Sequence, residues 1–213
     1  MLNQMMEWLG LLITQPRKAF EKMKDAPSFL PGTLFLLFFI IFSALYNQFT
    51  LSLSFEGILH EIPEESRMMF EWLFHSSSFY VFLAVFMLVS HFFQTSFYLL
   101  WFQFFGAHGR GFYLWNVFAF ANFPYLLVHL LGLIMIVAFG LNEWMFFGNI
   151  FSFAALIWSL YLIILGLSIE MNIRRLKVLG IFLLPWIIIF ALVVIFVVWM
   201  FASVAGLIIP ELM

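Results

Sequence analysis

The histidine and amide side chains within long apolar runs are the residues of this sequence best suited to chemistry. His91, Gln94 and Tyr98 recur at intervals of three and four residues, and Asn122 precedes His129 by seven. On a helix, each of these two groups occupies one face. Histidine can transfer protons or bind ligands near neutral pH, and amides both donate and accept hydrogen bonds.

Catalysis by these histidines would need an acid, base or nucleophile beside them. No Asp, Glu, Lys or Arg lies deep in the apolar runs, and the HExxH and GxSxG motifs are absent. Hydrogen-bonded pairing between helices and a ligand or ion path remain open. We therefore predict no enzyme activity, no catalytic residue, no metal and no cofactor. The candidate ligand or interhelical polar site comprises Asn47, His91, Gln94, Asn122 and His129.

The composition defines the surroundings of these side chains. Of 213 residues, 65% are hydrophobic and 9% are charged, whereas soluble domains carry about 25% charged residues. A chain of this size cannot bury so much apolar surface in an aqueous fold, so its solvent must be lipid. The net charge of −2 argues against nucleic acid as a partner. The lack of cysteine excludes disulfides, thiolate metal sites and cysteine nucleophiles.

Five stretches without Asp, Glu, Lys or Arg are each long enough for one membrane-spanning helix. We expect helices near residues 30–53, 78–104, 112–140, 150–170 and 178–204. The predicted fold is all-α, a polytopic membrane protein with a five-helix bundle. Residues 1–29 would form a cytoplasmic interfacial amphipathic segment, 30–204 the transmembrane domain, and 205–213 a short extracytoplasmic tail.

The stretch FGAHGRGF, residues 105–112, is a glycine-rich interruption between two predicted spans. A phosphate-binding P-loop would require GxxxxGK[ST] between a strand and a helix, and this stretch has no lysine or hydroxyl residue. We predict a tight turn in which glycine permits chain reversal and Arg110 marks one side of the membrane.

Basic residues gather on one side of the predicted bundle. Eight of the nine Lys and Arg residues would lie there, with Arg67 alone on the other side. The positive-inside rule then places the N-terminus in the cytoplasm and the C-terminus outside. Besides Arg110, these are candidate contacts for anionic lipid headgroups: Arg17, Lys18, Lys22, Lys24, Arg174, Arg175 and Lys177.

Two segments outside the spans carry further predictions. Residues 1–13 suit an interfacial helix, and Thr14 would cap a second helix with Pro16 in its first turn. This segment is either a membrane-surface anchor or a docking platform for lipid or a partner. In the acidic loop between the first two spans, His60 and His75 leave a weak cation site open.

Pro124 lies near the middle of the third predicted span. It removes one backbone hydrogen bond and should kink or break the helix. Asn122, two residues earlier, is placed to serve the freed backbone groups. Such a kink suits either a binding site or fixed packing.

Three stretches resemble the Yip family of Ypt/Rab-interacting membrane proteins: TQPRKAFEKMKDAP, FGAHGRGFYLWNVFAFANFPYLL and IWSLYLIILGLS. The resemblance implies five helices, a cytosolic N-terminus and a short distal C-terminus. Only about 29 residues precede the first span. In this respect the chain resembles a prokaryotic member of the family, which would lie in the plasma (inner) membrane. The positions that match the family's motifs are Pro16, Phe20, Gly106, Gly109, Gly111, Ala121 and Pro124.

The resemblance implies a non-enzymatic adaptor or organiser that contacts the bilayer, other membrane proteins or a second copy of itself. The alternative is a small transporter, channel or lipid-moving protein that uses the polar faces of the second and third helices.

Overall fold

The computed structural model describes residues 2–25, 28–58, 63 and 77–208, and the secondary structure of this part is helical throughout. The chain divides into two units, residues 1–172 and Ile173–Met213, and each is considered by itself. Five helical stretches are long and apolar enough to cross a membrane. The predicted all-α, five-span membrane fold is therefore confirmed.

The first unit begins with two short helices, α1 (Leu2–Thr14) and α2 (Pro16–Lys24). The predicted capping role of Thr14 was wrong, because Gln15 is the N-cap residue of α2. The Thr14 hydroxyl instead donates to the Gly10 carbonyl of its own helix, at 3.0 Å, a bond that threonine readily makes. Pro16 occupies the first turn of α2, as expected.

The spans of the first unit are α3 (Leu30–Ile58), α5 (Ser77–Phe104), the pair α6 (Gly111–Phe120) and α7 (Phe123–Phe139), and α8 (Leu141–Met171). The start of α8 lies nine residues before the predicted position 150. Gly140 alone reverses the chain between α7 and α8, with φ 105°, so no loop is needed there. Asn172, in the left-handed region at φ 51°, ends α8.

The third span is broken into α6 and α7, as Pro124 predicts. The break falls at Ala121 and Asn122, and α7 starts with Pro124 in its first turn. The Asn122 side-chain nitrogen donates to the carbonyls of Phe118 at 3.0 Å and Ala119 at 3.2 Å. The amide therefore serves backbone groups near the break, as expected.

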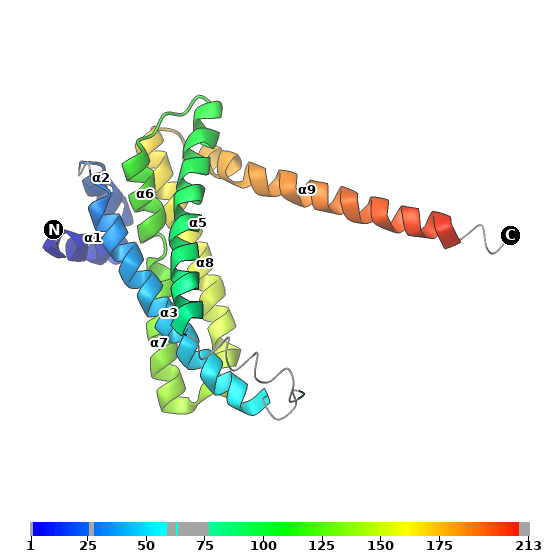
Figure 1. Ribbon diagram of the computed structural model, residues 1–213. Helices are drawn as coiled ribbons and strands as arrows, with labels where there is room; N and C mark the ends of the chain where they lie inside the picture. Colours follow the sequence, from blue (N-terminus) through cyan, green and yellow to red (C-terminus); the bar gives the residue numbers. More distant parts are fainter. Residues whose placement is uncertain (1, 26–27, 59–62, 64–76, 209–213) are drawn as a thin grey trace. The chain divides into compact units, whose positions relative to one another are not determined.

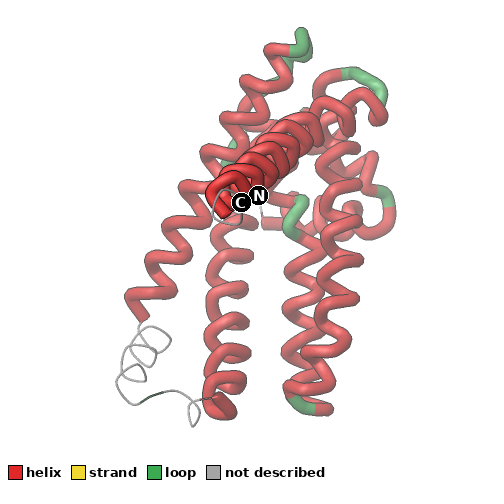
Figure 2. The backbone as a smooth tube through the Cα atoms, turned by 90° about the vertical axis from the view of Figure 1, so that its right-hand side faces the viewer, coloured by secondary structure: helices red, strands yellow, loops and turns green. Residues whose placement is uncertain are grey.

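The helices of this unit pack into one bundle (Figures 1 and 2). α6 packs against α3, α5 and α8, whereas α7 packs against α8 and α3. α2 lies against α8 and α6, so the N-terminal helices, the start of α6 and the end of α8 share one end of the bundle (Figure 1). Inside this end the rings of Phe35 and Phe120 stack with their centroids 4.8 Å apart.

The second unit contains a single long helix, α9 (Arg175–Ile208), with Pro185 inside it. Its most apolar window has a mean hydropathy of 3.2, the highest of the five spans. The predicted bounds of 178–204 agree with it to within four residues.

Candidate functional site

A buried carboxylate joins the glycine-rich turn to the end of α8. Glu170, whose side chain is 3% exposed, accepts hydrogen bonds from the backbone nitrogen, Nε and Nη2 of Arg110 at 2.9, 2.8 and 2.9 Å. Such bidentate, charge-assisted bonds are among the strongest that proteins form. The hydrogen bond with Glu170 raises the pKa of Arg110 above its ordinary value, so the guanidinium stays charged.

Lys24, at the end of α2, completes this cluster. Its Nζ donates to the carbonyl of Ile169 at 2.9 Å and lies 3.9 Å from the Glu170 carboxylate. The Nη2 atom of Arg110 donates in turn to the Lys24 carbonyl at 3.1 Å. Three segments that are distant in the sequence are thus held together by one acid and two cations.

Two glycines of the family motif fit this turn. Gly106 has φ 75°, a conformation that glycine adopts without the strain other residues incur. A Cβ at Gly109 would lie 3.0 Å from Leu114 Cδ1 and 3.4 Å from Glu170 Cγ. The close packing at Gly109 therefore keeps the turn next to Glu170.

The apolar side of α2 is buried in protein. Ala19, Phe20 and Met23 are all 0% exposed. The Phe20 carbonyl accepts a hydrogen bond from the buried Tyr113 hydroxyl at 3.1 Å. In α1, Trp8 is 1% exposed and packs edge-to-face on Phe120 with centroids 5.7 Å apart. The N-terminal helices are therefore part of the bundle's packed core.

The basic residues of this segment are mostly paired with acids. Arg17 bonds Glu21 at 2.8 Å, and Lys22 bonds Glu7 of α1. Lys18 is exposed. Of the other candidate lipid contacts, Arg174 directly precedes α9, and Arg175 and Lys177 lie in its first turn. Their assignment to lipid headgroups stays a prediction.

The five candidate polar residues separate into two pockets. One pocket, of about 210 Å³, is lined by His91 and Gln94 of α5, by Asn122 and by Phe39 of α3. His91 is 5% exposed and meets the Trp115 ring edge-to-face at 4.5 Å. Its Nε2 has no hydrogen-bond partner in the described part of the chain. Gln94, in contrast, is exposed at the pocket rim.

The second pocket, of about 350 Å³, holds Asn47 of α3 and His129 of α7. His129 Nδ1 lies 3.1 Å from the Ser43 hydroxyl, and its ring stacks on Tyr46 with centroids 4.5 Å apart. The ring of Phe39, which lines the first pocket, also stacks on His129, with the two ring centroids 6.0 Å apart. The Phe39, His129 and Tyr46 rings therefore lie between the two pockets.

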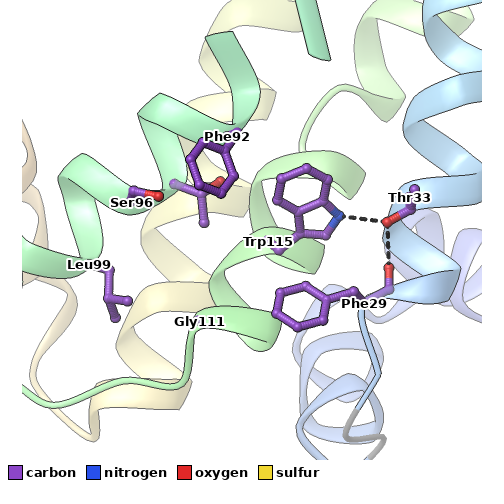
Figure 3. Close-up of a pocket in the computed structure, with 8 residues that line it drawn as sticks. Phe29, Thr33, Phe92, Ser96, Leu99, Gly111 and Trp115 are labelled. Atoms are coloured by element: carbon purple, nitrogen blue, oxygen red, sulfur yellow. Dashed lines mark hydrogen bonds between the residues drawn. The ribbon is translucent and has the colours of Figure 1, made fainter. Parts of the chain in front are cut away.

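Sequence reasoning missed a third feature, a groove of about 370 Å³ between α3, α5 and α6 (Figure 3). Thr95 of α5 lines it, is 6% exposed, and has an Oγ1 atom without a hydrogen-bond partner among the described residues. Trp115 Nε1 donates to the Thr33 hydroxyl at 3.1 Å in the same groove. A hydroxyl in an apolar run was the only signal for it in the sequence.

Metal binding receives no positive support from the described residues, which contain no group of three His, Cys, Asp or Glu side chains able to hold an ion. The weak cation site proposed for His60 and His75 lies outside the residues that the structure describes.

The family to which this helical bundle belongs follows from a match to a known domain. The model of the Yip1 domain matches residues 9–208, which include all five spans. The chain belongs to the Yip1 domain family. Comparison with curated proteins and with solved structures gave no match.

This Yip1 protein is therefore an integral membrane protein whose five spans agree with the expectation from the resemblance. The matched range contains the Arg110–Glu170 ion pair, both polar pockets and the groove beside Thr95.

Proposed function

We propose that this protein is a non-enzymatic membrane adaptor or organiser, and that α1 and α2 form its docking platform for another membrane protein. One observation carries the proposal. Phe20 and Met23 fix α2 to the bundle, while Arg17, Lys18 and Glu21 on the same helix are exposed. A platform held in place before binding loses little conformational entropy when a partner arrives.

The charge pattern of this platform supports a protein partner. Arg17 pairs with Glu21, and Lys22 pairs with Glu7, so both signs alternate over a short distance. Anionic lipid would favour a surface of one sign, whereas a mixed pattern selects a partner with the complementary arrangement.

We place the platform on the cytoplasmic side of a prokaryotic plasma membrane. The excess of basic residues on this side supports the orientation. Lys24 and Arg110 meet at the same end of the bundle through Glu170, which supports grouping the N-terminal segment with the 105–111 turn.

Photo-crosslinking in native membranes tests the adaptor function. A photoreactive residue at exposed Lys18 should give one discrete adduct, with a mass that separates another protein from a second copy of the 25.0 kDa chain. Exchanging the charges by Arg17→Glu with Glu21→Arg preserves the ion pair within α2 and reverses its pattern. The adduct should then fall several-fold while the thermal stability stays unchanged. An adduct that is missing in the wild type, or unaffected by the exchange, would contradict the proposal.

A second candidate function, solute or lipid transport, is favoured by the two polar pockets along α3. Leu36 and Ile40 line the first pocket, and Asn47 and Thr50 line the second. These four positions share one face of α3. For transport, the solute or lipid would have to pass the rings of Phe39, His129 and Tyr46, which lie between the two pockets.

Flux assays in vesicles test this alternative. His91→Ala or Asn122→Ala should abolish ion, solute or lipid movement that the wild-type protein catalyses. The exposed Gln4→Ala, in α1, serves as the control. Vesicles in which the wild type moves none of these species would exclude the alternative.

A further inference from the structure

The outer side of α5 carries an amide that the bundle leaves without a partner. Gln94 is exposed, and its side chain makes no hydrogen bond to any of the described residues. The amides of Asn116 and Asn122, in contrast, each donate to a backbone carbonyl, at 2.8 and 3.0 Å. A polar group in a span is costly unless it is hydrogen-bonded, so Gln94 requires a partner from outside the described bundle.

Gln94 lies within the hydrocarbon wherever the bilayer crosses α5. It follows Ser77, at the start of the helix, by 17 residues and precedes Phe104, at the end, by 10, or roughly 25 and 15 Å of helix rise. A hydrocarbon layer about 30 Å thick is shorter than α5, which is roughly 40 Å long, and it includes Gln94 at every position along the helix. Water at either membrane surface is therefore no substitute for a hydrogen-bonding partner.

The same side of α5 has the residue spacing of a helix-pairing seam. Its residues follow one another at alternating intervals of four and three: Leu83, Met87, Ser90, Gln94, Phe97 and Trp101. This alternation is the a and d pattern of helices that pair along their length. Met87 and Phe97 are 37% and 46% exposed, and Ser90 is exposed as well. A small residue such as serine lets two helices approach closely in a membrane.

We propose that α5 forms the interface of a parallel homodimer, in which the Gln94 side chains of two copies hydrogen-bond each other. Copies inserted by the same rule have the same orientation, so two α5 helices run parallel and their equivalent a and d residues meet at one depth. A glutamine amide offers both donors and an acceptor, so two copies satisfy each other without a third group. The pocket of about 210 Å³ that Gln94 lines leaves room for the second amide. This interface does not depend on the docking role of α1 and α2.

Cysteine cross-linking in native membranes tests the geometry of this interface, because the chain contains no cysteine. After addition of a membrane-permeant oxidant, Ser90→Cys should give a disulfide-linked species with twice the mass of the 25.0 kDa chain. Phe92→Cys serves as the matched control. Phe92 is 58% exposed, but it lies two residues from both Ser90 and Gln94 and so faces away from them around the helix. It should therefore form no cross-link.

Energy transfer between copies labelled at exposed His108→Cys measures the contribution of the amide. The full-length protein is placed in phosphatidylcholine vesicles and diluted with lipid until the copies separate. Gln94→Leu should raise the dissociation constant about fivefold or more, the effect of losing interhelical hydrogen bonds in a membrane. Gln94→Asn keeps an amide and should restore most of the affinity, whereas Phe92→Leu on the opposite side of α5 should leave it unchanged.

Three results would overturn the proposal. One is a Gln94→Leu protein that associates as tightly as the wild type. Another is cross-linking through Phe92→Cys but not through Ser90→Cys, which would place a different side of α5 between the copies. The last is a photoreactive residue at position 90 that reaches only lipid, α9 or another protein, because these would then cover the seam. A melting temperature of the Gln94→Leu monomer in detergent at least as high as that of the wild type confirms an intact fold.

Discussion

The Glu170 carboxylate is bonded to Arg110 through three nitrogen atoms, although sixty residues separate the two in the chain. Arg110 is the N-cap residue of α6, and Glu170 lies in the last turn of α8. The ion pair therefore fixes the entry of the third span against the exit of the fourth. Lys24 connects the same point to the N-terminal helices.

Removing the charge of Glu170 should destabilise this end of the bundle. Glu170→Gln leaves the Arg110 guanidinium facing an amide, and we expect the free energy of unfolding to fall by about 2–3 kcal/mol, the scale of hydrogen bonds to charged groups. Glu21→Gln removes an exposed ion pair and should cost less than about 0.5 kcal/mol. Denaturant unfolding in detergent micelles measures both, and equal effects would contradict a structural role for the buried pair.

Loss of the Phe20 ring should detach α2. Phe20→Ala removes a ring that is 0% exposed, and such truncations cost about 3–5 kcal/mol. Amide hydrogen exchange over residues 2–25 should accelerate at least tenfold as the N-terminal helices open. Lys18→Ala on the exposed face should leave exchange unchanged. Unaltered protection in the Phe20 variant would show that α2 is held by other contacts.

A methyl group at Gly166 should disturb the contact between α8 and α6. A Cβ there would lie 2.8 Å from both Cγ atoms of Val117, whose branched side chain has little freedom to move. We expect Gly166→Ala to lower stability by about 1–3 kcal/mol. Gly10 in α1 has no neighbour within 4 Å of the same position, so Gly10→Ala should stabilise by about 0.5–1 kcal/mol. Thermal melting in detergent should therefore show shifts of opposite sign.

The predicted topology can be tested directly because the chain contains no cysteine. Single cysteines at Lys18 and at exposed His108 should react with a membrane-impermeant maleimide only after the cells are opened. Pro63→Cys should react in intact cells. Labelling of Lys18→Cys and Pro63→Cys from the same side would refute the predicted orientation.

The sequence predicted the number and approximate position of the spans, because apolar runs bounded by charges depend on local composition alone. It also predicted the break near Pro124, since the missing N–H is a property of that residue. The start of α8 was missed, because nothing in the composition shows that Gly140 alone would reverse the chain.

The polar candidates were harder to place. Asn122 is the N-cap residue of α7 and His129 lies within this helix, so both belong to one continuous element. Seven residues, or roughly 10 Å of helix rise, nevertheless separate them, and they line different pockets. The Arg110–Glu170 pair was missed for another reason. Each residue marked a membrane boundary in the sequence, but their contact depends on how α8 packs against the turn.

Because the third span is divided into α6 and α7, the two ends of the bundle can accept substitutions independently of each other. α6 belongs to the end that holds the ion pair, whereas α7 packs with α8 around the pocket of His129. The Ser159 hydroxyl donates to the Ala121 carbonyl at the joint between them. Substitutions that remodel the pocket beside α7 are therefore expected to leave the packing around Arg110 and Glu170 intact.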